Sequence, residues 1–326
     1  MTDRAAWRGQ DLAVGEHTCT LSEEEVAELQ AALARTKVAG RHWLECEAAD
    51  FRLPRLDRTL QRLHDDVRDG TGFVLLRGLP VREHGKDDLR AMAWMIATRF
   101  GRPVGQNAKG ERIADVMDVI KGKASPRGYH SNAELRLHTD PASDIIGLCC
   151  LEAAKEGGDS LLASALTVHD EMKARRPDLL EVLYEGFPYA RFGEGRSDDP
   201  DVTDYPVPVL SVVQGKVSCR YGSNRIRGAT EALGRPLSAK QTEALALFRE
   251  LAQENAVTFR MAPGDFLIVN NLTLLHARTT FVDNDDPARP RHLLRFWIEG
   301  RDFRPIAPEL NFFNRGRCGI VPKEIA

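Results

Sequence analysis

Three side chains of this sequence have the types and spacing that bind a transition metal. His138 and Asp140 stand two residues apart in Leu-Arg-Leu-His-Thr-Asp, and His276 lies far downstream in Leu-Leu-His-Ala-Arg. Two imidazoles and one carboxylate can occupy one face of an octahedral Fe(II) ion and leave three positions open. Because residues i and i+2 of a strand point to the same side, His138 and Asp140 could grip one ion. His276 must then come from a different strand.

A His-x-Asp tripeptide alone is weak support, since most single histidines are packed or exposed rather than bound to metal. The segment Gly157-Gly-Asp-Ser160 is most simply a turn, although it also places a hydroxyl after the Asp140 region. The apolar run 266–271 predicts a strand that leads to His276, which by itself would more simply be a core histidine. The metal hypothesis therefore depends on the three features together.

Two arginines near the C-terminal end indicate an anion. In Arg291-His-Leu-Leu-Arg-Phe-Trp297, alternation places Arg291, Leu293, Arg295 and Trp297 on one face of a predicted strand. Guanidinium groups that point inward are costly without anionic partners, and they bind carboxylates bidentately. The alternative is that this face is solvated.

The patterns around these motifs predict a β-rich fold with helices. Expected helices cover 22–36, with a Ser22/Glu25 capping box, 57–69, 86–99, 167–184 with an interruption near Pro177, and 238–254. Expected strands cover 72–78, 145–151, 207–213, 216–221, 257–261, 266–270 and 292–298. Residues 102–134 are expected to be irregular and 190–204 to form a mobile loop. Many short strands without regular helix alternation favour a β-sandwich or jelly roll over a doubly wound sheet.

The composition narrows the classes of partner. A net charge of −3 gives no electrostatic support for binding nucleic acid or an anionic membrane. We see no apolar stretch of membrane-spanning length and no secretory signal. The six cysteines show no C-x-x-C spacing, which favours reduced thiols in a cytoplasmic protein. We therefore expect a small-molecule partner, and a homo-oligomer is possible.

Taken in order, these motifs resemble the TauD/TfdA family of Fe(II)- and 2-oxoglutarate-dependent oxygenases, to which clavaminate synthase is related. The resemblance covers roughly residues 70–300. It implies one structural domain of mainly β structure with α additions, a double-stranded β-helix (jelly-roll) core flanked by helices. Residues 1–55 would be a helical extension packed on the core, and residues 56–326 would form the oxygenase jelly roll.

The resemblance also implies roles for particular residues. His138, Asp140 and His276 would bind Fe(II), and Arg291 would pair with the distal carboxylate of 2-oxoglutarate. Ser160 stands where the family usually has a threonine that contacts the same carboxylate. Arg295 would face the substrate, with Glu134 and Asn132 as further substrate-side residues. For Glu134, an exposed carboxylate with no such role is an equally good interpretation.

The implied reaction hydroxylates a C–H bond of a small carboxylate-bearing or amino-acid-like substrate, consumes O2 and 2-oxoglutarate, and releases succinate and CO2. Asp140 argues against halogenation, because related halogenases have a small residue there. The same site would also support desaturation, cyclisation or C–heteroatom cleavage of, for example, a sulfonate or aryloxy acid. A zinc hydrolase, a non-catalytic barrel that binds small acids and a nucleic-acid demethylase are the competing hypotheses.

Overall fold

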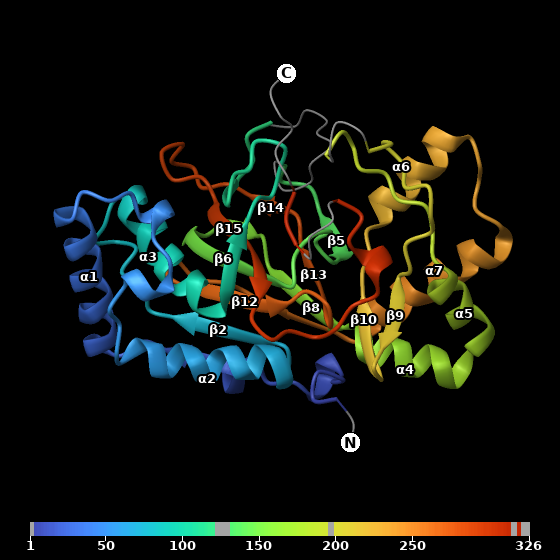
Figure 1. Ribbon diagram of the computed structural model, residues 1–326, viewed down its shortest axis with the longest axis horizontal. Coiled ribbons are helices and arrows are strands. Elements are labelled where there is room, and N and C mark those ends of the chain that lie inside the picture. Colours follow the sequence, from blue (N-terminus) through green and yellow to red (C-terminus); the bar gives the residue numbers. More distant parts are fainter. Residues whose placement is uncertain (1–2, 121–130, 195–198, 314–317, 321–326) are drawn as a thin grey trace.

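The computed structural model describes residues 3–120, 131–194, 199–313 and 318–320, and its centre is built from two sheets (Figure 1). The larger sheet has the order β1-β2-β12-β6-β15-β3, and β4 also pairs with β15. The smaller sheet has the order β11-β8-β13-β5. Among the described strands every pairing is antiparallel except that of β1 with β2.

The strands of the larger sheet are β1 (Thr18–Thr20), β2 (Phe73–Arg77), β3 (Gly101–Val104), β4 (Ile113–Val116), β6 (Ile145–Glu152), β12 (Phe266–Asn270) and β15 (His292–Gly300). Those of the smaller sheet are β5 (Leu135–His138), β8 (Ser160–Ser164), β11 (Ala256–Phe259) and β13 (Leu274–Arg278). Two short pairs are added, β7 (Glu156–Gly157) with β14 (Phe281–Val282) and β9 (Leu210–Val213) with β10 (Lys216–Cys219).

One apolar cluster joins the two sheets. It includes Phe73, Cys150, Leu267 and Leu293 from the larger sheet and Leu162 from the smaller one, all buried. Because strand side chains alternate between faces, the opposite faces of the same strands are free to pack against helices. The result is the jelly-roll core that the sequence predicts, with a helical layer on its outer faces.

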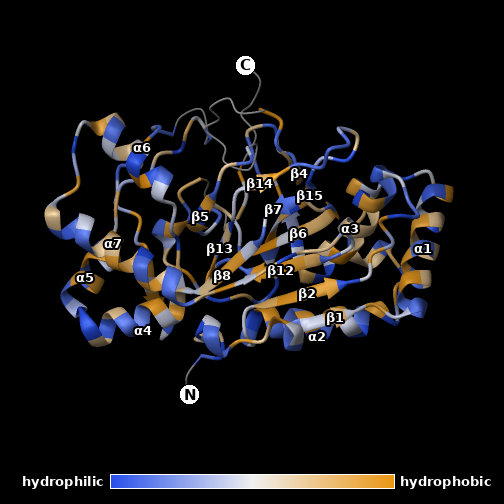
Figure 2. Ribbon diagram, turned by 180° about the vertical axis from the view of Figure 1, so that it is seen from behind, coloured by the Kyte–Doolittle hydropathy of each residue, from blue (hydrophilic) through white to orange (hydrophobic). Residues whose placement is uncertain are grey.

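The helices gather at the two ends of the molecule (Figures 1 and 2). They are α1 (Glu23–Val38), α2 (Leu56–Asp69), α3 (Lys86–Phe100), α4 (Ala165–Arg175), α5 (Pro177–Glu185), α6 (Ser223–Leu233) and α7 (Ala239–Glu254). Short 3-10 turns cover Gly9–Asp11, Val14–His17, Trp43–Glu45, Ala48–Asp50 and Pro308–Leu310. Figure 2 shows apolar residues concentrated on the central strands, whereas the outer helices carry both polar and apolar residues. None of the helices in the described ranges combines the length and apolar character that a bilayer crossing requires.

The N-terminal residues pack onto this core. Leu29 and Leu33 of α1 share a buried cluster with Trp94 of α3 and with Phe296 of β15. The strand β1 extends the larger sheet through its pairing with β2. The helix α1 begins with the predicted capping box. The hydroxyl of Ser22 accepts from the amide of Glu25 at 3.2 Å, and the amide of Ser22 donates to the carboxylate of Glu25 at 2.9 Å.

Most predicted elements are present within a few residues of their expected ends, including the break between α4 and α5 at Pro177. The irregular stretch predicted at 102–134 is partly wrong, because β3 and β4 lie inside or beside it and pair with β15. Residues 121–130 of that stretch, and 195–198 of the loop predicted at 190–204, lie outside the described residues. The helix α6 and the strand β8, both beside the site, were not predicted, whereas β13 is the separate strand that was expected to carry His276. The sequence of α6 has few apolar residues, which weakens the helical pattern.

Candidate metal centre

The strands β5 and β13 place two histidines opposite each other. His276 is the register partner of His138, and their ring centroids are 4.2 Å apart. The Nδ1 atom of His138 lies 2.8 Å from the carbonyl oxygen of Arg136. A ring that donates there presents Nε2 as its lone-pair nitrogen, the usual arrangement of a metal-binding histidine. The Nδ1 atom of His276 is buried and has no hydrogen-bond partner among the described residues.

Asp140 completes the group from the loop that follows β5. One ligand atom from each of His138, Asp140 and His276 lies within 4.8 Å of the other two. Nε2 of His138 lies 4.0 Å from Oδ1 of Asp140. The expectation that His138 and Asp140 share a strand face is wrong, because β5 ends at His138. It is the turn after β5 that brings the carboxylate towards the imidazoles.

The main chain of Asp140 is clamped by two side chains that sequence reasoning missed. Its amide donates to Oδ1 of Asn271 at 2.8 Å, and Nδ2 of Asn271 donates back to its carbonyl oxygen at 2.8 Å. Nη1 of Arg220 donates to the same carbonyl at 2.6 Å. The Asn-Asn pair at the end of β12 was the only sequence signal for this clamp. The three hydrogen bonds hold the main chain of a residue that lies outside any strand.

The carboxylate of Asp140 is oriented from β15. Nε1 of Trp297 donates to Oδ2 at 2.7 Å, and Nη1 of Arg295 lies 3.4 Å from Oδ1. Because Trp297 donates its hydrogen bond to Oδ2, Oδ1 is the carboxylate oxygen that faces the two imidazoles. The sequence places Trp297 on one face with Arg295 but gives no sign that its indole donates a hydrogen bond to the site.

The protonation states suit a metal at neutral pH. Burial lowers the pKa of His276 to about 3, with the neighbouring His138 adding to the effect. Burial also lowers the pKa of His138, against the opposing pull of Asp140. For Asp140, burial alone would raise the pKa, but Arg295 and the two histidines together hold it below its usual range. Neutral imidazoles and an ionised carboxylate are the forms that bind metal.

This donor set fits a divalent iron ion. Two nitrogen ligands and one carboxylate on one side, with the other side open to a cavity, match the pattern of non-haem Fe(II) oxygenases. A tetrahedral structural zinc site would need a fourth protein ligand, and the described part of the chain offers no fourth histidine, cysteine or acidic residue in this group.

A second buried site lies next to the triad, in the interior of the roll. The guanidinium groups of Arg278 and Arg291 lie over the ring of Phe281, with their Cζ atoms 4.7 and 4.9 Å from its centroid. Nη1 of Arg291 and Nε of Arg278 are buried without hydrogen-bond partners among the described residues. Burial, together with the charge of Arg291, lowers the pKa of Arg278 to about 10. A carboxylate would satisfy both unpaired groups.

Ser160 and Gly158 border this arginine pair. Ser160 is the register partner of Arg278 across the β8–β13 ladder, so the two side chains share a face. Gly158 has φ of +72°, and any Cβ atom there would lie 2.9 Å from Nε of Arg291. A glycine is therefore required for Arg291 to lie along this turn. The alternative that this face of β15 is solvated is wrong, since Arg291 and Arg295 are only 4% and 7% exposed.

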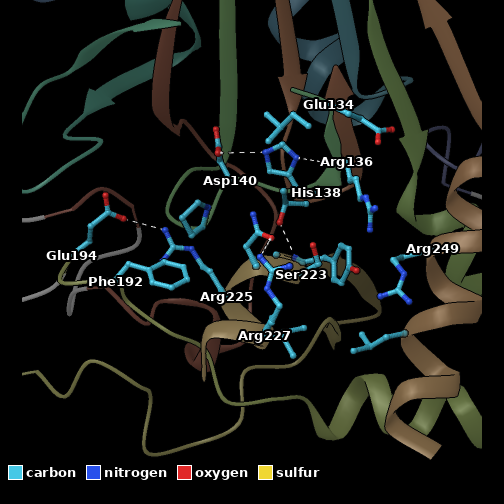
Figure 3. Close-up of a pocket in the computed structure, with 18 of the residues that line it drawn as sticks. Glu134, Arg136, His138, Asp140, Phe192, Glu194, Ser223, Arg225, Arg227 and Arg249 are labelled. Carbon is cyan, nitrogen blue, oxygen red and sulfur yellow. Dashed lines mark hydrogen bonds and ion pairs between the residues drawn. The ribbon is translucent and has the colours of Figure 1, made fainter. Parts of the chain in front are cut away.

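A cavity of about 660 Å³ opens from the triad to the surface (Figure 3). His138, Asp140, Arg295 and the predicted Glu134 all line it. Asn132 is not among its lining residues; its side chain is exposed and its carbonyl oxygen accepts from the amide of Phe281. The first turns of α6, which the sequence did not predict, form a large part of the opposite wall.

Comparison with known proteins places this geometry in context. The model of the family described as "Taurine catabolism dioxygenase TauD, TfdA family" matches residues 34–297. The chain is 30% identical over 315 residues to FR-33289 synthase of Streptomyces rubellomurinus, covering 93% of this chain and 92% of that protein. It is 33% identical over 310 residues to the taurine hydroxylase-like protein SAT17 of Stachybotrys chartarum, covering 90% and 78%.

The fold has solved counterparts. A structure of asparagine oxygenase in complex with Fe(II), 2S,3S-3-hydroxyasparagine and succinate superposes with a TM-score of 0.68 at 21% identity, covering 86% of this chain and 93% of that one. At this identity the likeness concerns the fold.

Proposed function

The chain belongs to the TauD/TfdA family of dioxygenases, and we propose that it hydroxylates a C–H bond of a small anionic, amino-acid-like substrate with Fe(II), 2-oxoglutarate and O2. The other products are succinate and CO2. The observation that carries the proposal is the placement of the His138, Asp140 and His276 triad beside a buried arginine pair with unsatisfied nitrogens. A metal site and an adjacent carboxylate site are what this chemistry needs.

We assign His138, Asp140 and His276 as the iron ligands, and Arg291 with Ser160 as the residues that hold the distal carboxylate of 2-oxoglutarate. When bound, iron together with 2-oxoglutarate and O2 supplies the oxidising equivalents that convert a C–H bond to an alcohol. The chain's own residues supply geometry. Trp297 holds the Asp140 carboxylate at 2.7 Å, so the ligand keeps its orientation while substrate exchanges in the cavity.

Substrate would enter through the cavity that ends at the triad. Arg295 lines this cavity beside Asp140, and its positively charged guanidinium group favours a substrate that carries an acidic group. Glu134 at the exposed rim is the corresponding candidate for an ammonium group. One relative is named as taurine hydroxylase-like, in keeping with a small charged substrate.

We also propose that the enzyme works in the cytoplasm. The six cysteines carry thiols rather than disulfides in the described structure, and thiols persist in a reducing compartment. Burial raises the pKa of Cys150 to about 12, so this thiol within the core stays protonated and unreactive.

The deciding experiment is a turnover screen with Fe(II), ascorbate and 2-oxoglutarate over amino acids, polyamines, sulfonates and aryloxy acids. We expect oxygen-dependent succinate release coupled to a product that carries one oxygen atom from ¹⁸O₂. A product formed without O2 consumption would support a zinc hydrolase and overturn the proposal. A product that has lost two hydrogens would indicate desaturation or cyclisation instead of hydroxylation. Two product fragments would indicate cleavage.

A further inference from the structure

We propose that the end of the cavity remote from Asp140 binds a phosphoryl or phosphonyl group, a tetrahedral oxyanion with two negative charges. This inference rests on the proposed function, because it names the substrate class of the same cavity. The group would be held by Arg136 of β5, Arg249 of α7, the hydroxyl of Tyr221 and the start of α6.

The first observation is two arginines without acidic partners. Arg136 and Arg249 both line the cavity and are exposed, and no ion pair joins either of them to an acidic residue in the part of the chain that the structure describes. Figure 3 draws both guanidinium groups on the far side of His138 from Asp140. A pair of cations on one wall, from two elements that are distant in sequence, forms a site for an anion with several acceptor oxygens.

The acidic residues of the cavity do not neutralise this end. Asp140 belongs to the triad, and Glu194 is paired with Arg225 at 3.1 Å. Figure 3 shows that pair on the opposite side of the cavity from Arg249. Glu134 is then the one remaining acid among the lining residues, so Arg136 and Arg249 leave a net positive charge. The electrostatic attraction to such a positively charged wall is stronger for a dianion than for a monoanion.

The second observation is a buried hydroxyl that lacks a partner. Tyr221 is 1% exposed, lines the cavity, and has no hydrogen-bond partner for its hydroxyl among the described residues. The neighbouring Arg249 and Ser223 act on this hydroxyl by lowering its pKa, against the effect of burial. Burial raises the pKa of Tyr221, so the hydroxyl keeps its proton and can donate. An unsatisfied buried donor is costly, and a ligand oxygen would satisfy it.

The third observation is the direction of α6. This helix of 11 residues begins at Ser223, next to Tyr221, and its N-cap Gly222 has no side chain to cap the first turn. Gly222 and Ser223 both line the cavity. The positive end of the helix dipole therefore faces the same space as the two arginines and the hydroxyl, and phosphate groups bind at such helix starts.

The position of this site sets the size of the substrate. Arg136 precedes His138 by two residues on β5, so both side chains point to the same face, and their Cα atoms are separated by roughly 7 Å along the strand. A molecule that spans from the arginines to the metal is therefore short. The substrate class is a small phosphonate or phosphate ester whose reacting C–H bond lies a few bonds from phosphorus.

The test measures binding to the full chain by calorimetry at pH 8, without iron or turnover. The probes are propylphosphonate, propanesulfonate and butyrate, which share a chain and differ in head group. We expect propylphosphonate to bind at least about tenfold more tightly than the two monoanions. Arg136→Gln and Arg249→Gln should each weaken it by about tenfold, the loss of one charge-assisted hydrogen bond, and Tyr221→Phe by a few-fold.

Two further variants show where the probe binds. Arg58→Gln removes the same charge from the exposed side of α2 and should change affinity by less than about twofold. Arg291→Gln should have equally little effect on propylphosphonate, because the interior arginine pair is a separate site. Equal binding of the three probes, wild-type affinity in both Arg136→Gln and Arg249→Gln, or loss in Arg291→Gln alone would overturn the proposal. Absence of oxygen-dependent succinate release, in the same screen extended to small phosphonates and phosphate esters, would instead count against the proposed function.

Discussion

Trp297 donates its indole N–H to Oδ2 of Asp140 over 2.7 Å, from a strand in the larger sheet to a loop that leaves the smaller one. The bond joins the two sheets at the metal centre. It also assigns different tasks to the two oxygens of the carboxylate, since Oδ1 is the atom that approaches Nε2 of His138. The position of Asp140 therefore depends on contacts from both sheets.

We predict that Trp297→Phe weakens Fe(II) binding by about ten- to a hundredfold, the effect of removing a hydrogen bond that orients a ligand. The phenyl ring retains most of the packing volume, so the fold should be preserved. Anaerobic titration with Fe(II) or Co(II) gives the affinity. Trp94→Phe is the matched control, because that indole donates to the carbonyl of Cys46 in the outer core. Equal affinity in the Trp297 variant and the wild type would refute the orienting role.

His276→Ala should abolish the weak visible charge-transfer band expected for the protein with anaerobic Fe(II) and 2-oxoglutarate, because one of the three ligands is lost. The measurement is an absorbance difference spectrum. In the control His169→Ala, the lost ring bonds Tyr184 and Asp170 on the helical side of the molecule, and the band should be retained. A band of normal intensity in His276→Ala would show that this histidine is not a ligand.

Arg291→Gln should weaken 2-oxoglutarate binding by at least about tenfold, since a hydrogen bond to a charged group contributes roughly 1.5–3 kcal/mol. Equilibrium binding of 2-oxoglutarate to the iron-loaded protein reports this directly. Arg289→Gln removes a neighbouring arginine that is half-exposed and pairs with Glu152, and it should leave the affinity unchanged. Similar losses in both variants would indicate a general charge effect instead of a specific site.

Metal affinity should change little between pH 7 and 5.5. The folded-state pKa of His276 is lowered to about 3 and that of His138 is lowered in the same direction, both by burial. Protons compete with a metal only below the folded pKa, so the imidazole of His276 stays neutral through this window, and the lowered pKa of His138 favours its neutral form as well. A histidine with the ordinary pKa of about 6.5 would lose roughly tenfold in affinity over the same range. Co(II) titrations at the two pH values distinguish these outcomes, and a tenfold or larger fall would contradict the burial argument.

Local patterns were sufficient for most elements. The capping box at Ser22, the apolar strand at 266–270 and the proline break at Pro177 depend on neighbours within a few residues, and the structure has all three. The helix α6 was missed because its stability comes from packing of Ile226 and Ala229 on other elements, a contribution that its own composition does not reveal.

The residue types of the site were determined by the sequence itself: two histidines, an aspartate and two arginines in a fixed order predict iron, a carboxylate cosubstrate and oxygenation. Their arrangement was decided by the tertiary structure. Asp140 lies outside β5, and its position results from Asn271, Arg220 and Trp297, which are 80 or more residues away. Arg136, Tyr221 and Arg249 come together only when β5, α6 and α7 enclose one cavity. Sequence spacing predicts neighbours along a strand, whereas convergence of a loop, a helix start and two sheets depends on long-range packing.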